Sequence, residues 1–179
     1  MNKLTSIILI LFLSLLSSPS WSETLTIDDL LERNDLFYKK YTDVPFTGEV
    51  SGMKNGKFKN GMKVGEWLTY DIEGQLNGEW LFYRENGQLK EKGNYKDGKK
   101  DGLSETYYKN GQLWSKGNYK DGTFDGLFER YHENGQLRVK GNYKDGKEEG
   151  LWEYFNKDGS LEKTETWKNG KRTNCEGDC

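Results

Sequence analysis

Residues 78–98 read GEWLFYRENGQLKEKGNYKDG, and this stretch decides the fold because it returns along the chain with small changes. The tripeptide that begins at Gly87 recurs at a constant interval, which we call the repeat period. Its later copies are Gly111-Gln112-Leu113, Gly135-Gln136-Leu137 and Gly159-Ser160-Leu161. A fixed period of this length indicates a tandem-repeat protein, in which each unit contacts mainly its neighbours.

Two further patterns keep the same period. The segment from Gly93 to Gly98 returns from Gly117, from Gly141 and, more loosely, from Glu165. A glycine also precedes each aromatic-rich run, and these glycines are Gly65, Gly78, Gly102, Gly126 and Gly150. The later intervals between them all equal the repeat period, whereas the first, from Gly65 to Gly78, is close to half of it. We expect the unit before Gly78 to have lost one strand with its turn.

Each unit is predicted to contain two strands and two turns. In one copy the strands are Leu151 to Phe155 and Leu161 to Trp167. Asn-Gly and Asp-Gly pairs separate the strands, and such pairs accept the positive φ angles of type I′ hairpin turns. These pairs begin at Asn55, Asn60, Asn86, Asp97, Asn110, Asp121, Asn134, Asp145, Asp158 and Asn169. Because every connection is local, the sequence predicts an all-β antiparallel meander.

The register of the hairpins has two solutions. A two-residue loop at Asn86-Gly87 places Trp80 opposite Gly93, where the indole covers a backbone that has no side chain. A three-residue loop slips the register by one residue and places Tyr83 opposite Leu89. Both remain open at the level of sequence.

Aromatic side chains are the candidate partner-binding residues. We expect one aromatic stripe along the array, formed by Trp67, Trp80, Phe82, Phe128, Trp152 and Tyr154. Trp114 stands where the other copies hold Lys90, Arg138 and Glu162. An indole in place of charge indicates either a contact residue for a partner or local packing against Phe128 or Ser104.

Composition limits the function classes. The chain has 27 basic and 29 acidic residues and a net charge of −2, which argues against a nucleic-acid or anionic-lipid surface held by bulk charge. It contains 22 glycines, 2 prolines and no alanine, so few helices are expected. Aromatic residues make up 14% of the chain, more than a disordered polar chain would carry.

The N-terminus has the pattern of a signal peptide. Lys3 precedes the apolar run Ile7 to Leu13, and small residues at Ser20 and Ser22 suit cleavage near Glu23 or after Ser20. The run is too short for a stop-transfer helix, so no transmembrane segment is expected in the mature chain. After it, Thr26 to Tyr38 is either a short helix capped by Thr26 or a strand pair. We favour the strand pair, because the edge of the first repeat needs cover.

Cys175 and Cys179 are the two cysteines of the chain and lie at its C-terminal end. In an oxidising compartment we expect them to form a small disulfide ring that pins the tail. Free or intermolecular thiols are the alternative. A metal site would need two further ligands, which this tail does not offer.

Residues for catalysis are not apparent. His132, the single histidine, is expected at a solvent-exposed strand end, where other copies hold Arg84 and Asn156. The repeated acids Glu105, Glu129 and Glu153 are expected on a solvated sheet face, not as an acid/base pair. The glycines close hairpins and do not open helices, so phosphate loops are not indicated. The sequence therefore predicts no enzyme, no cofactor and no metal.

The pattern G-x-W-x-x-Y-x-x-x-G-Q-L followed by K-G-N-Y-K-D-G-K-x-x-G resembles bacterial MORN repeats, in the variant found in YwqK-type antitoxins of toxin–antitoxin systems. The similarity covers roughly residues 56–171, and Asp43 to Gly48 resembles the segment that leads into such repeats. The resemblance implies an elongated, twisted, nearly single-layer sheet of β-hairpin repeats. It also implies a binding scaffold without shared catalytic residues.

These observations divide the chain into four parts. We expect a signal peptide over 1–22, an N-terminal capping segment over 23–52, the repeat array over 53–172 and a tail with the cysteine pair over 173–179. The predicted function is a non-catalytic protein-interaction scaffold, secreted or in the periplasm, of the antitoxin or immunity type. The alternative is a module that binds the cell wall or another envelope glycan.

Overall fold

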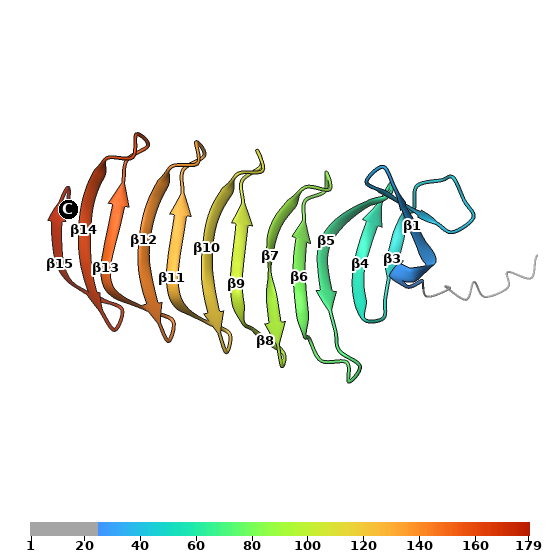
Figure 1. The fold of residues 1–179 in the computed structure, drawn as a ribbon, viewed down its shortest axis with the longest axis horizontal. Coiled ribbons are helices and arrows are strands. Elements are labelled where there is room, and N and C mark those ends of the chain that lie inside the picture. The colour runs from blue at the N-terminus through green and yellow to red at the C-terminus, as the bar shows by residue number, and fades with distance from the viewer. Residues whose placement is uncertain (1–24) are drawn as a thin grey trace, which may run out of the picture.

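The computed structural model describes residues 25–179, and from Gly48 onward they form one long row of antiparallel strands (Figure 1). The predicted signal peptide lies outside the described residues. The sheet begins with β3 (Gly48–Val50), β4 (Lys54–Lys59), β5 (Met62–Thr69), β6 (Gly78–Tyr83), β7 (Leu89–Lys96), β8 (Lys99–Lys100) and β9 (Gly102–Tyr107). It continues with β10 (Leu113–Lys120), β11 (Thr123–Tyr131), β12 (Leu137–Lys144), β13 (Lys147–Phe155), β14 (Leu161–Lys168) and β15 (Lys171–Gly177). The strands pair in chain order, with β8 as a short extension beside β7, so the predicted all-β meander is confirmed.

Two kinds of turn alternate along the sheet. Positive φ angles at both residues, as in type I′ turns, occur at Asn60-Gly61, Asp97-Gly98, Asp121-Gly122, Asp145-Gly146 and Asn169-Gly170. In the turns at Gly87, Gly111, Gly135 and Gly159 only the glycine has a positive φ. There the preceding side chain accepts a hydrogen bond from the backbone N–H two residues on, for example Asn110 Oδ1 from Gln112 at 3.0 Å. The prediction of a type I′ turn at every pair was therefore wrong for these four, and also for Asn55-Gly56, which lies inside β4.

The register contains both predicted solutions. Trp80 lies opposite Gly93, and three residues further along β6 Tyr83 lies opposite Leu89. A one-residue shift between Phe82 and Tyr83 reconciles the two pairings, so Lys90 is the extra residue of a β-bulge. The same shift recurs in the later hairpins and makes Trp114, Arg138 and Glu162 the corresponding extra residues.

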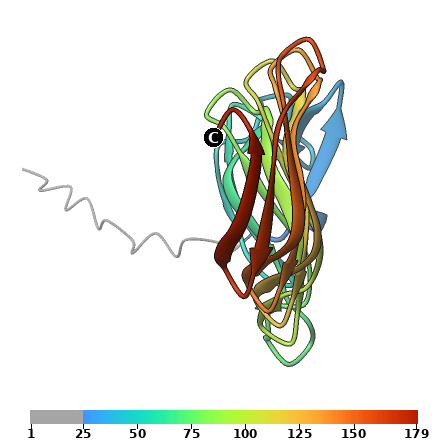
Figure 2. The same cartoon turned by 90° about the vertical axis from the view of Figure 1, so that its left-hand side faces the viewer.

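The sheet has two distinct faces because side chains alternate along each strand. We call the face that carries Trp80, Ser104, Phe128 and Trp152 the aromatic face. The other, which carries Leu81, Glu105, Glu129 and Glu153, we call the ladder face. Viewed along the row of strands, the sheet forms a thin, curved layer, with the N-terminal segment to one side (Figure 2).

A small hairpin packs on the ladder face at the N-terminal end. A 3-10 helix at Ile27–Asp29 leads into β1 (Leu30–Arg33) and β2 (Leu36–Lys39), which pair with each other in a separate sheet. Both predicted alternatives for this segment are thus partly present, because Thr26 caps the short helix and the strand pair follows. Leu25 bridges Val50 at the sheet edge, while Leu30 and Phe37 cover Phe58 and Trp67. The hairpin therefore covers a face more than an edge.

Trp67 does not belong to the predicted aromatic stripe. It lies directly opposite Leu81, and paired residues of antiparallel strands point to the same face. Trp67 is therefore on the ladder face, whereas Trp80 is on the aromatic face. The cause is the shortened unit: β5 and β6 are adjacent without an intervening strand, and the loss of one strand reverses the face on which an equivalent residue lies.

The C-terminal boundary of the array also differs from the prediction. β15 continues to Gly177 and pairs with β14 as far as Lys163, so most of the predicted tail is part of the last strand. Cys175 faces Glu165 on β14 and is joined to Cys179 by a disulfide. Within residues 25–179 the structure forms no helix of the length and apolarity that crossing a bilayer requires.

Candidate binding face

The aromatic face carries a row in which large rings alternate with glycines. Phe128 lies opposite both Gly117 and Gly141, and Trp152 lies over Gly141. A side chain on Gly141 would overlap the indole of Trp152. The alternation gives a thin sheet a substitute for a core, since Trp80, Phe128 and Trp152 are each at most 8% exposed without a second layer above them.

Rings on neighbouring strands extend this row into a cluster over β10 to β13. Phe124 stacks on Tyr143 at 5.2 Å between ring centroids and meets Phe128 edge-on at 5.7 Å. Tyr143 in turn meets Trp152 at 5.1 Å. Such offset and edge-to-face pairs are the arrangements that aromatic rings favour. Most of the ring surface here is used within the sheet.

The row is interrupted at β9. Other strands place large side chains at the two outward positions, as β6 does with Trp80 and Phe82 and β13 with Trp152 and Tyr154. β9 has Ser104 and Thr106 instead. A hollow of about 280 Å³ lies over these small residues, with Trp80, Trp114 and Phe128 among its walls.

Trp114 lies on the aromatic face at the rim of this hollow. The Arg130 guanidinium is 5.0 Å from the centre of the Trp114 ring and 5.5 Å from that of Phe128. Trp114 thus contacts Arg130 and lines the hollow together with Ser104 and Phe128. Its ring contact is with Arg130, and Trp114 is half-buried. Its role as a contact residue for a partner stays a prediction.

Two cations line the hollow without a carboxylate partner. The Lys100 ammonium lies 4.2 Å from the centre of the Trp80 ring and 5.5 Å from that of Tyr119. Over residues 25–179, no acidic side chain lies within ion-pair distance of Lys100 or Arg130. Glu91 also lines the hollow, but it pairs with Lys90 at 3.1 Å.

A shallower groove of about 760 Å³ adjoins the hollow and shares Glu91, Thr106 and Trp114 with it. Its other side runs along the turns and includes Arg84 and Tyr108. The two cavities form a continuous depression centred on Trp114.

His132 is not a free, solvent-exposed residue as expected. It is half-buried, and its Nε2 lies 2.9 Å from the backbone oxygen of Phe155 in the next repeat. Arg84 donates to Tyr107 O at 2.7 Å and Tyr108 to Tyr131 O at 2.8 Å from the equivalent positions. These side chains therefore join successive repeats, and the His132 bond requires a proton on Nε2.

The acids of the ladder face are paired, not freely solvated. Lys92 contacts Glu105 at 2.6 Å, and the same cross-strand pair recurs as Lys116 with Glu129 and Lys140 with Glu153. The hydrogen bond from Lys92, assisted by one from Tyr107, lowers the pKa of Glu105, and Glu105 raises the pKa of Lys92 to about 12. A repeated, stably ionised pair is a structural contact and supplies no acid/base chemistry at neutral pH.

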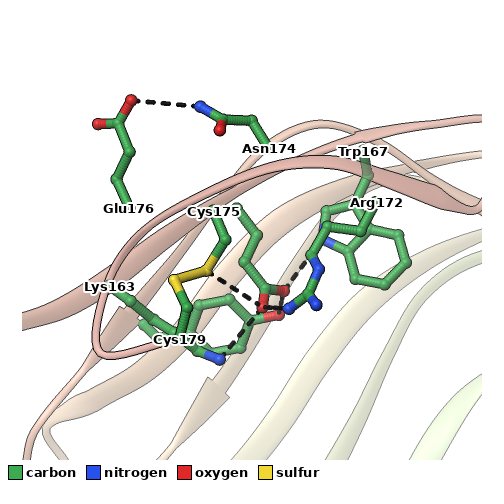
Figure 3. Close-up of a disulfide and its surroundings, with 9 residues drawn as sticks. Lys163, Trp167, Arg172, Asn174, Cys175, Glu176 and Cys179 are labelled. Carbon is green, nitrogen blue, oxygen red and sulfur yellow. Dashed lines mark hydrogen bonds and ion pairs between the residues drawn. A yellow bond between two sulfur atoms is a disulfide. The ribbon is translucent and has the colours of Figure 1, made fainter.

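Glu165 is a buried carboxylate at the C-terminal end of the aromatic face, next to Cys175 of the disulfide that Figure 3 shows. It replaces the glycine that three earlier copies hold and lies opposite Trp152 and Cys175. Its oxygens accept hydrogen bonds from Arg172 at 2.8 Å, Tyr154 at 2.9 Å, Lys163 at 3.1 Å and Trp167 at 3.2 Å. Burial raises the pKa of Glu165, but the bonds from Arg172, Tyr154 and Lys163 outweigh burial and hold it at about 2.

The structure brings most of the predicted site residues together on one face. Trp80, Phe82, Trp114, Phe128, Trp152 and Tyr154 lie on the aromatic face, and Trp67 does not. Sequence reasoning missed Lys100, Arg130 and Glu165. The signal was present for two of them, because Arg130 stands where sibling strands have Phe82 or Tyr154 and Glu165 stands where siblings have glycine.

Four tandem segments of the chain, residues 76–97, 100–121, 124–145 and 148–169, match the family described as MORN repeat variant. Each match covers one strand pair of the sheet. Repeats of this kind indicate a repeat-based binding module. No curated protein matches the chain significantly.

Solved structures show distant likenesses. A GtfA/B complex bound to UDP and GlcNAc matches 68% of this chain at 14% identity and a TM-score of 0.29. TarM matches 57% at 16% identity and a TM-score of 0.35. A structure of accessory secretory proteins 1, 2 and 3 from Streptococcus pneumoniae matches 74% at 19% identity and a TM-score of 0.24. The chain spans a quarter or less of each of these chains: 24%, 20% and 21%.

Proposed function

We propose that this chain, which contains four tandem MORN-type repeats, is a non-catalytic scaffold that binds a partner protein through its aromatic face. The observation that carries the proposal is the depression centred on Trp114. Elsewhere on this face large rings close over glycines, whereas Ser104 and Thr106 leave a hollow beside Trp114. The small side chains at these two positions leave a concave surface that no other part of the described chain fills. Such a surface favours recognition of another molecule.

The proposed location is the bacterial envelope, either secreted or periplasmic. Residues 1–22 support this through their signal-peptide pattern, and the Cys175–Cys179 disulfide suits an oxidising compartment. The proposed role as an antitoxin or immunity-type protein is supported by the resemblance of the repeats. In that role the partner would be a toxin whose surface fits the depression.

A second candidate is a module that binds an envelope glycan. The groove beside the hollow favours it, because Tyr108 and Trp114 place aromatic rings along about 760 Å³. Both candidates use the same face. They differ in the component of an envelope extract that the chain would retain, a protein for the first candidate and a glycan for the second.

The test uses the mature chain as bait in an envelope extract of its own organism, with Trp114→Lys as the variant. Lysine occupies the equivalent bulge position at residue 90, so the fold tolerates it there. The matched control is Leu151→Ala, which removes a side chain that is 53% exposed outside the aromatic face. We expect the wild type and the control to retain one protein at a fixed stoichiometry, and Trp114→Lys to lose it.

Equal retention by all three proteins would refute the use of the aromatic face. Sedimentation of the wild type with purified peptidoglycan, lost in Trp114→Lys, would support the glycan candidate instead. Turnover of a substrate that survives in Trp114→Lys would contradict the non-catalytic part of the proposal.

A further inference from the structure

The hollow over β9 is large enough to receive a side chain of another molecule. Its floor is formed by Ser104, Thr106, Ser115 and Gly117, and its volume is about 280 Å³. The sibling strands fill the same space with their own rings, since Phe128 and Trp152 occupy the position of Ser104. A group that enters from outside would therefore take the place of a ring that this repeat lacks.

The polar groups around the hollow determine the charge of the ligand that it can bind. Among residues 25–179 the buried Nε of Arg130 has no hydrogen-bond partner, and its guanidinium carbon lies 5.0 Å and 5.5 Å from the ring centres of Trp114 and Phe128. An unpaired buried donor costs free energy until an acceptor reaches it. An arginine guanidinium beside aromatic rings presents its remaining N–H groups in a fixed fork, which matches the two oxygens of a carboxylate.

Lys100 adds a second positive charge to the lining. Its ammonium is held over Trp80 and Tyr119 and has no acidic partner in the described part of the chain. The one acid in the lining, Glu91, is neutralised by Lys90. The hollow therefore has an excess of positive charge on a chain whose net charge is −2.

The position of these cations argues against stacking of a sugar on the rings of the hollow. Arg130 covers the ring faces of Trp114 and Phe128, and Lys100 covers that of Trp80. What a ligand meets is a cation backed by a ring. Such a site pairs with an anion, and the ring faces that the two cations cover are not free for a neutral pyranose.

We propose that the hollow over β9 receives a glutamate or aspartate side chain of the partner protein, whose carboxylate pairs with Arg130 and Lys100. This inference deepens the proposed function and rests on it. It assigns the chemistry of the contact: an acidic segment of a protein, anchored at one carboxylate.

The probe for this site is hexaglutamate, titrated into the mature chain while tryptophan fluorescence is recorded, since Trp80 and Trp114 line the hollow. We expect saturable binding that weakens as salt rises, because salt screens the pairing of charges. Arg130→Gln and Lys100→Gln should each weaken the binding at least about tenfold. Arg138→Gln is the matched control and should bind as the wild type does. It removes an exposed cation outside the hollow, at the bulge position that corresponds to Trp114 in the next repeat.

Ser104→Phe provides a second, independent variant. It restores the ring of the sibling strands, fills the hollow and leaves both cations in place, and the phenylalanine at 128 shows that the fold accepts it. We expect normal thermal unfolding and loss of hexaglutamate binding. Binding that persists in Ser104→Phe, or that is equal in Arg130→Gln and wild type, would overturn the inference.

Oligogalacturonate is titrated in parallel as an acidic glycan. Binding of this probe in preference to hexaglutamate would overturn the assignment to a protein segment. The inference fails separately from the proposed function: retention of the partner by Ser104→Phe together with its loss in Trp114→Lys would leave the scaffold function standing and remove the carboxylate contact.

Discussion

The indole of Trp152 lies on the backbone of Gly141, so close that a methyl group on this glycine would overlap the ring. The same relationship links Trp80 to Gly93 and Trp67 to Gly56. A single-layer sheet has no opposing layer to bury its rings, so it buries them against bare backbone on the neighbouring strand.

Gly141→Ala should therefore destabilise the array by about 1–3 kcal/mol, the usual cost of overpacking, although alanine is no worse than glycine in an extended strand. Urea unfolding measures the loss. In a Trp152→Ala background the cost of Gly141→Ala should largely disappear, because the ring that the methyl group displaces is gone. An equal cost in both backgrounds would contradict the pairing.

Glu165 predicts a specific pH dependence. Its folded pKa of about 2 lies below the value of about 4.3 expected in the unfolded chain, so its contribution to stability is complete above about pH 5 and is lost as the pH falls toward 2. Glu165→Gln should lower stability by about 2 kcal/mol at pH 7, and the difference from wild type should shrink through the acidic range. Melting temperatures between pH 7 and pH 2 measure this. Glu176→Gln, at an exposed position bonded only to Asn174, should track the wild type at every pH.

The disulfide should have a local effect. Cys175 and Cys179 are separated by only 4 positions in the sequence, so the chain entropy that the bond removes is worth about 2 kcal/mol at most. On reduction, amide hydrogens of β15 should exchange faster while those of β9 and β10 stay unchanged, because each strand contacts only its neighbours. Hydrogen exchange followed by mass spectrometry resolves the two regions. Faster exchange throughout the sheet would show that the bond stabilises the whole array.

Variants at Trp67 and Trp114 should affect different properties, the free energy of unfolding and partner binding respectively. Trp67 is 4% exposed and packs against Phe58 under the N-terminal hairpin, so Trp67→Ala should cost about 3–5 kcal/mol. Trp114→Lys should leave the unfolding midpoint nearly unchanged and remove partner binding. Denaturation and pull-down of the two variants give this double comparison. Loss of binding with intact stability in a Trp67 variant would place the binding surface on the ladder face.

Much of the fold followed from the sequence because the repeats determine it locally. The constant repeat period, the two strands in each unit and the antiparallel order were all predicted and are confirmed. The register was predicted only as a choice between two pairings. The bulge at Lys90 allows both, and a pattern of alternation does not reveal a residue that interrupts it.

The site was harder to predict, because it depends on what is missing from one repeat. Ser104 was visible in the alignment of repeats, but the hollow arises only because Thr106 lies beside it and Trp114 rises from a bulge on the next strand. Lys100 in the short strand β8 stands where the next two copies hold Phe124 and Glu148, so the repeat pattern does not determine the side chain at this position. Predicting the side of the sheet on which Trp67 lies requires the number of strands in the shortened unit. One strand more or fewer moves Trp67 to the opposite face.

That shortened unit also governs how such an array can change in length. Insertion or deletion of one whole repeat adds or removes two strands and leaves every downstream side chain on its original side of the sheet. A change of one strand turns all downstream positions over, as the step from Trp67 to Trp80 does. Gain or loss of whole repeats therefore changes the length of the array and keeps the Trp114 depression on the same side of the sheet. Gain or loss of half a repeat would move the depression to the opposite side.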